Sequence, residues 1–237
     1  MSNNQATTVD IQQVQQSLYQ KLEGTEWQSK LKMFILSGDY QTLLMSLLDQ
    51  VNSGKRFTPR VKDTMNAFIE CPYKDLKAVI VGQDPYPQLG VADGISFSCS
   101  TTGVAQPSLR LINAALLDCF PDYEAKTDLR VWANQGILMI NTALTTEIGK
   151  PGTHYSIWEP FLAYLFDMLS TNNPKLVYLF MGKKAQEWGS YVHNDSVILN
   201  VSHPASAAYS GGKWNHNSVF QQLTDEVDKM FGYQIKW

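Results

Sequence analysis

The sequence is short of cysteine, of charge and of long apolar runs. Cys71, Cys99 and Cys119 are widely spaced and odd in number, so neither a disulfide framework nor a paired-cysteine metal site is indicated. An iron–sulfur cluster usually requires more cysteine ligands than this chain has. No stretch reaches the roughly 18 consecutive apolar residues of a membrane span, and the first residues lack the pattern of a signal peptide. We expect buried cysteines and a cytoplasmic protein, or a nuclear one if the source is a eukaryote or its virus.

A broad basic surface is also missing. The formal net charge is −3, which argues against a protein that grips long stretches of nucleic acid. Any contact with DNA must be local, through loop amides, hydroxyls and a few lysines. The 237 residues, 44% hydrophobic and 17% charged, fit one α/β domain. We expect a flexible polar tail over residues 1–8 and a single domain over 9–237.

The apolar residues that are present predict helices first and then strands. Residues 11, 14, 18 and 22 recur at helical spacing, as do 43, 44, 47, 48 and 51 behind a possible cap at Asp39. Short apolar runs at 78–81, 137–140, 176–181 and 197–201 favour strands buried on both faces. Helical segments at 108–119, 128–134 and 157–170, a short one after Gly182 and a final one over 219–230 alternate with them. We predict a three-layer α/β/α fold with a central four-stranded, mainly parallel sheet.

Polar residues follow each predicted strand. Asp84 comes after the first, Asn141 ends the second, Gly182 and Lys183 follow the third, and His203 follows the fourth. Each has an ordinary structural explanation as a turn, cap or loop residue. Ligands of open parallel sheets, however, bind beyond the carboxyl ends of the strands, so the topology predicts one shared site.

Seven segments in the right order resemble family-1 uracil-DNA glycosylases. Residues 82–87 read GQDPYP and resemble the water-activating loop GQDPYH. The other six are GISFS at 94–98, QPSL at 106–109, GILMINT at 136–142, the stretch 149–158, GKKAQ at 182–186 and SHP at 202–204. The resemblance covers roughly residue 57 to the end of the chain, and it implies a monomeric enzyme that excises uracil from single- or double-stranded DNA in base-excision repair.

The resemblance also implies how a flipped uracil would be held. Asn141 would donate to uracil O4 and accept from N3–H, a pattern that cytosine does not match. Tyr86 would exclude the methyl group of thymine, Phe97 would stack on the base, and Gln83 would complete the pocket floor. Flanking DNA would meet Pro107, Ser108, Gly182, Lys183, Ser206 and Ala207.

Two residues would carry the chemistry. Asp84 would stabilise an oxocarbenium-like sugar and orient or deprotonate water, while a neutral His203 would donate to uracil O2 as negative charge develops there. No metal or organic cofactor is required by this scheme. A protein inhibitor or a replication partner is a possible macromolecular ligand.

Several positions depart from the family pattern. The last residue of the water-activating loop is Pro87, and Gln106 replaces the first Pro of the PPSL loop. Ala205 and Ala207 stand where the HPSPLS-type loop has a phosphate-contacting Ser and an intercalating Leu. Because alanine is a poor plug for a gap in a base stack, we expect a preference for single-stranded DNA unless Tyr209 or Trp214 acts as the wedge.

Three other interpretations compete with this one. The chain could be a DNA-binding replication accessory protein that keeps the fold with little turnover, although such a role does not need all five of Asp84, Tyr86, Phe97, Asn141 and His203. It could be a glycosylase of broader mismatch specificity, which Tyr86 disfavours. An unrelated α/β hydrolase would need a GxSxG nucleophile elbow, which the sequence lacks.

Overall fold

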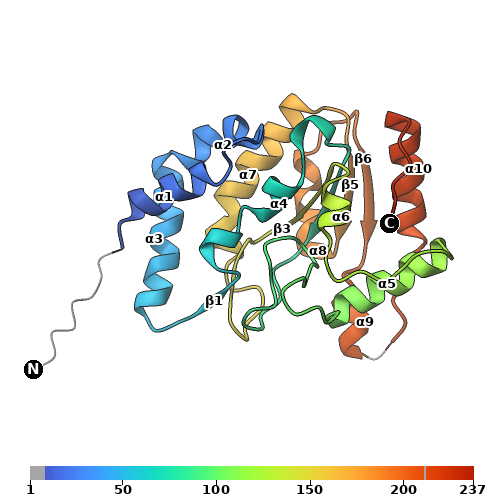
Figure 1. The fold of residues 1–237 in the computed structure, drawn as a ribbon, viewed down its shortest axis with the longest axis horizontal. Coiled ribbons are helices and arrows are strands. Elements are labelled where there is room, and N and C mark those ends of the chain that lie inside the picture. Colours follow the sequence, from blue (N-terminus) through green and yellow to red (C-terminus); the bar gives the residue numbers. More distant parts are fainter. Residues whose placement is uncertain (1–8, 211) are drawn as a thin grey trace, which may run out of the picture.

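A four-stranded parallel sheet forms the centre of the protein (Figure 1). The computed structural model describes residues 9–210 and 212–237, so the expected tail over 1–8 lies outside the described residues. The strands are β2 (Ala78–Gly82), β3 (Ile137–Asn141), β5 (Val177–Met181) and β6 (Val197–Val201), in the order β3-β2-β5-β6. All neighbouring strands are parallel, which confirms the predicted fold class.

Alternate residues of the strands face two separate apolar cores. Val79, Val81, Tyr178 and Phe180 pack toward the N-terminal helices and α7 (Tyr155–Asn172). Their sequence neighbours, such as Ile80, pack toward α5 (Pro107–Cys119) and α10 (Val219–Phe231) on the other face. Helices therefore cover both faces of the sheet, as Figure 1 shows. Continuous apolar runs were the correct signal because strands in such a layer are buried on both sides.

The N-terminal helices differ in part from the prediction. Helix α1 (Ile11–Gln20) is capped by Asp10, and α3 (Gly38–Asn52) is capped by Ser37, whose hydroxyl accepts from the amide of Tyr40. Asp39 lies inside the first turn of α3, so its assignment as the cap was wrong. Helix α2 (Trp27–Ile35) was not predicted, although it buries four apolar side chains.

Of the remaining helices, those over 130–133 and 183–186 occupy predicted segments, whereas the helix over 66–70 was not predicted and the helix over 204–210 falls in an expected loop. They are α4 (Asn66–Glu70), α6 (Arg130–Ala133), α8 (Lys183–Gln186) and α9 (Pro204–Ser210), with 3-10 turns at η1 (Val61–Asp63), η2 (Tyr73–Asp75) and η3 (Glu187–Tyr191). Helix α6 is shorter than the predicted 128–134, and α9 was expected to be a loop. Within the described residues, no helix has the length and apolar content that a membrane crossing demands.

The strand over residues 197–201 was expected to be buried on both faces, and it is not. Strand β6 is an edge strand whose residues are mostly half-buried or exposed, with Ile198 at 40% exposure, so it is not buried on both faces. Val51 is likewise exposed at the end of its helical stripe. Cys71 and Cys99 are buried as expected, whereas Cys119 is only half-buried.

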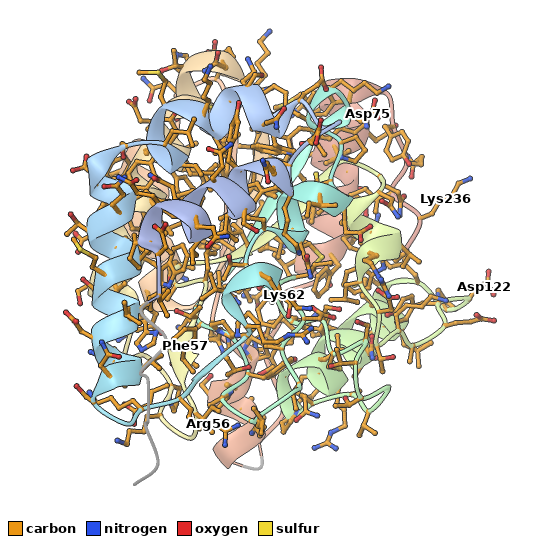
Figure 2. All side chains as sticks on the ribbon, turned by 60° about the vertical axis from the view of Figure 1, so that its left-hand side comes forward. Arg56, Phe57, Lys62, Asp75, Asp122 and Lys236 are labelled. Atoms are coloured by element: carbon orange, nitrogen blue, oxygen red, sulfur yellow. The ribbon has the colours of Figure 1, made fainter. Side chains whose placement is uncertain are left out.

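A second, two-stranded sheet lies beside the carboxyl ends of the large one. Strands β1 (Phe57–Thr58) and β4 (Thr146–Glu147) pair antiparallel. Figure 2 shows Arg56 and Phe57 in the extended segment that follows α3. The Phe57 ring contacts His154, with 5.9 Å between ring centroids. This pairing anchors the segment that connects β4 to α7, which reaches the candidate site.

Candidate active site

The loops that follow the strands meet around one cavity at the carboxyl edge of the sheet. Its volume is about 200 Å³. It is lined by Gln83, Asp84, Pro85, Tyr86, Pro87, Phe97, Ser108, Pro151, His203 and Ala205. Six residues singled out from the sequence are thus brought together, although they span more than half of the chain. A cavity of this size suits a single base rather than a larger ligand.

Asn141 lies in a smaller cavity that adjoins the first. This cavity measures about 20 Å³ and shares Tyr86 and Phe97 with the larger one. The side-chain oxygen of Asn141 accepts a hydrogen bond of 2.8 Å from the Ser96 hydroxyl, which fixes the plane of the amide. A Cβ at Gly82 would lie 2.3 Å from that oxygen, so only glycine fits beside it. The backbone before Asp84 and the amide are therefore in direct contact.

The carboxylate of Asp84 accepts a hydrogen bond from the segment that connects β4 to α7. The backbone amide of Gly152 donates to Oδ2 at 2.6 Å, and the hydroxyls of Thr146 and Tyr155 also donate to the carboxylate. Partial burial raises the pKa of Asp84, and these hydrogen bonds oppose the rise. The carboxyl group thus lies in a partly desolvated place, where a negative charge on it would act strongly on its neighbours.

His203 is poised as a neutral hydrogen-bond donor. Burial lowers its pKa to about 4, so the imidazole is uncharged at neutral pH. The amide of Ala205 donates to Nδ1 at 3.2 Å, which leaves the single ring proton on Nε2. The Phe97 ring lies beside the imidazole, with 5.6 Å between centroids. A Cβ at Gly182 would lie 2.7 Å from the His203 Cβ, so this glycine permits the close approach.

Phe97 is fixed in a backbone conformation that side chains rarely adopt. Its φ is +63°, and its carbonyl accepts from the Tyr86 hydroxyl at 3.0 Å. The buried carboxylate of Asp93 holds the same loop by accepting from Ile95, Ser98 and Ser100. An aromatic ring at this strained position is consistent with a binding surface.

The residues expected to meet flanking DNA differ in how deeply they are buried. Ser108 is buried in the cavity wall, at the start of α5 behind Pro107. Lys183 and Ser206 are exposed outside the cavity lining, and the Ser206 hydroxyl donates to the His203 carbonyl. Ala207 packs against the core between the sheet and α5.

One of the two alternative wedge residues is excluded by its burial. Trp214 is 3% exposed, and its indole N–H donates to the carbonyl of Ser202 at 3.0 Å. It was a wrong candidate, because such a buried ring cannot enter DNA without unfolding its surroundings. The side chain of Tyr209 lies outside the described part of the structure.

The donors around the cavity do not form a metal site. Among residues 9–210 and 212–237, no three His, Cys, Asp or Glu side chains gather in a way that could hold a metal ion. What the cavity does offer is a carboxylate, a neutral imidazole, an amide and an aromatic face.

Comparison with known proteins identifies the family. The model of the Uracil DNA glycosylase superfamily matches residues 68–227. The chain belongs to this superfamily. A uracil-DNA glycosylase of Acinetobacter baylyi is 33% identical over 215 residues, which cover 89% of this chain and 90% of that relative. A uracil-DNA glycosylase of Mesomycoplasma hyopneumoniae is 31% identical over 201 residues, which cover 84% of this chain and 91% of that relative.

Solved structures of uracil-DNA glycosylases share the fold. The mimivirus uracil-DNA glycosylase has a TM-score of 0.82 at 24% identity, covering 97% of this chain and 89% of its own. A mimivirus UNG variant in complex with UGI has a TM-score of 0.80 at 25% identity, and the match covers 90% of this chain and 87% of that variant's chain.

Some residues that build this uracil-DNA glycosylase site were not found from the sequence. Ser96 orients Asn141, and Gly152 and Tyr155 hold Asp84. The stretch 149–158 was noted for its resemblance to the family, but nothing in its sequence identified the partner of Asp84. That contact joins residues 68 positions apart.

Proposed function

We propose that this superfamily member hydrolyses the N-glycosidic bond of deoxyuridine flipped out of DNA, and so initiates base-excision repair. The observation that carries the proposal is the meeting of Asp84, His203 and Phe97 at one base-sized cavity, with Asn141 in the adjoining one. A target base inside a duplex is out of reach, so the nucleotide must rotate into this cavity.

The base is read by three side chains. The Asn141 amide can donate to O4 and accept from N3–H, since its oxygen has a second lone pair beside the Ser96 hydrogen bond. Phe97 supplies the stacking face, and Tyr86 stands where a C5 methyl group would lie. Gln83 closes the floor, where its carbonyl accepts from the Thr142 hydroxyl at 2.8 Å.

The bond breaks with opposite charges developing on its two sides. Asp84 stabilises the positive sugar and orients or deprotonates the attacking water. His203 donates its Nε2–H to uracil O2 as the leaving base becomes an anion. The neutral imidazole can fill this role, because its Nε2–H stabilises the developing anion by hydrogen bonding without transferring its proton. The steps need no organic cofactor.

DNA on either side of the target is positioned by the rim. Ser108 lines the cavity, and in this proposal it contacts phosphates and sugars rather than base edges, together with Pro107, Gly182, Lys183, Ser206 and Ala207. Such a local footprint agrees with the net charge of −3.

We further propose a monomer that works in the cytoplasm, or in the nucleus of a eukaryotic host, and that binds a protein inhibitor over the same rim. The complex of a mimivirus UNG variant with UGI supports the binding of a protein, though it does not bear on the surface used. A non-enzymatic accessory role is disfavoured, because DNA binding alone requires neither the held carboxylate of Asp84 nor the neutral His203.

Release of free base from oligonucleotides tests the function. We expect the protein to release uracil, and neither cytosine nor thymine, from otherwise identical oligonucleotides in the presence of EDTA, with cleavage at the abasic site after alkali. No uracil release from either single- or double-stranded DNA would refute the proposal.

A further inference from the structure

Two of the most exposed apolar side chains of the protein lie on neighbouring loops beside the cavity. Leu89 is 61% exposed and Val104 is 60% exposed. Among the large hydrophobic residues that the structure describes, only Met33, on α2, is more exposed. A single exposed apolar residue is ordinary, but two of them on joined loops beside a cavity offer a bound partner an apolar contact.

Leu89 is placed by the loop that leaves the cavity. Pro87, two residues earlier, lines the cavity, and its carbonyl accepts from the amide of Gly149 at 2.9 Å. On the other side of Leu89, the carbonyl of Gly90 accepts from the Thr101 hydroxyl at 2.7 Å. The loop is therefore pinned on both sides of a side chain that itself points into solvent.

Val104 belongs to the loop that enters the cavity from the other direction. Thr101 joins the two loops through its bonds to Gly90 and Val91. The Val104 carbonyl accepts from the Gln106 side chain at 3.1 Å, just before the segment that brings Ser108 to the cavity wall. Leu89 and Val104 thus lie on two loops that hydrogen bonds join next to the cavity.

The α9 side of the cavity cannot supply such a contact from its described side chains. Ala205 lines the cavity, and Ser206, Ala207 and Ala208 follow it. These side chains are too short to reach between stacked bases. Proteins that open a base stack usually insert a larger apolar wedge such as Leu, Ile, Met or Phe.

We propose that Leu89 is the wedge that enters the base stack when the target nucleotide leaves a duplex, with Val104 packing on the neighbouring deoxyribose. The inference rests on the proposed function and specifies how its duplex substrate is opened. Single-stranded DNA has no stack of paired bases to open, so Leu89 matters there much less.

Excision rates on matched single- and double-stranded oligonucleotides test the proposal. We expect Leu89→Ala to lower the single-turnover rate on duplex DNA about 10-fold and to leave the single-stranded rate within about twofold. Leu89→Met should retain most of the duplex rate, because it keeps an apolar side chain of similar length. Unchanged melting temperatures would establish that all variants are folded.

Leu117→Ala is the matched control. Leu117 is 52% exposed on α5, nine residues beyond Ser108, which places it about 13 Å along the helix from the cavity wall. We expect no change in either rate.

Two results would overturn the proposal. One is an unchanged ratio of duplex to single-stranded rates in Leu89→Ala. The other is a Tyr209→Ala variant that loses the duplex rate while Leu89→Ala keeps it. Failure of the proposed function is a different result, since the wild-type protein would then release no uracil from either substrate.

Discussion

At the scale of single residues, Asp84 and His203 differ in how their surroundings shift their pKa values. Burial raises the pKa of Asp84 and lowers that of His203, so both groups are shifted toward their neutral forms. Hydrogen bonds from Gly152, Thr146 and Tyr155 counteract the shift at Asp84 alone. The proposed function assigns the Asp84 carboxyl to the sugar and the uncharged His203 imidazole to the base.

The proposed role of Tyr86 in excluding thymine gives a prediction at this scale. Tyr86→Ala should open space for the C5 methyl group and raise thymine release at least about 10-fold over the wild type, since one methyl group is worth a discrimination of that order. Quantifying free thymine from a thymine-containing single strand measures the effect.

Tyr86→Phe is the control, because it keeps the ring and removes the hydroxyl that donates to the Phe97 carbonyl. It should continue to exclude thymine. Equal thymine release by both variants would show that the hydroxyl, rather than the bulk of the ring, sets the specificity.

At the scale of helices and strands, the elements that could be predicted are those marked by continuous apolar runs. All four large strands were located, because each is an apolar run in a mostly buried layer. Helix α2 was missed despite Trp27, Leu31 and Phe34 at helical spacing. The exposure of β6 could not be foreseen, because it depends on which edge of the sheet is left uncovered: β3 lies at the other edge and is buried throughout.

Helix α9 gives the prediction at this scale. Its Ala207 stands where the resembled family has an intercalating Leu, so α9 adds nothing there to the proposed wedge Leu89, and we expect a higher excision rate on single-stranded than on double-stranded uracil DNA. Ala207→Leu should move the ratio of these rates toward the duplex, by about 10-fold at most. A ratio unaffected by Ala207→Leu would show that α9 has no part in opening the duplex.

At the scale of the whole molecule, the parallel sheet brings distant loops together. The rule that ligands bind at the carboxyl ends of parallel strands located the shared edge from the sequence alone. It could not predict the contacts that complete the site, such as Gly152 to Asp84, because they depend on how the small β1–β4 sheet orients its loop. It also gave no sign that Trp214 is buried under its own loop.

The central claim is that this convergence makes Asp84 the group that acts on the sugar, and the Asp84→Asn variant tests it most directly. Asparagine has nearly the same shape but carries no charge and is no base. In single-turnover uracil release from a single-stranded oligonucleotide, with DNA affinity measured in parallel, we predict a loss of about 10²- to 10⁴-fold in rate and affinity within a few-fold of wild type. A rate within a few-fold of the wild type would contradict the account.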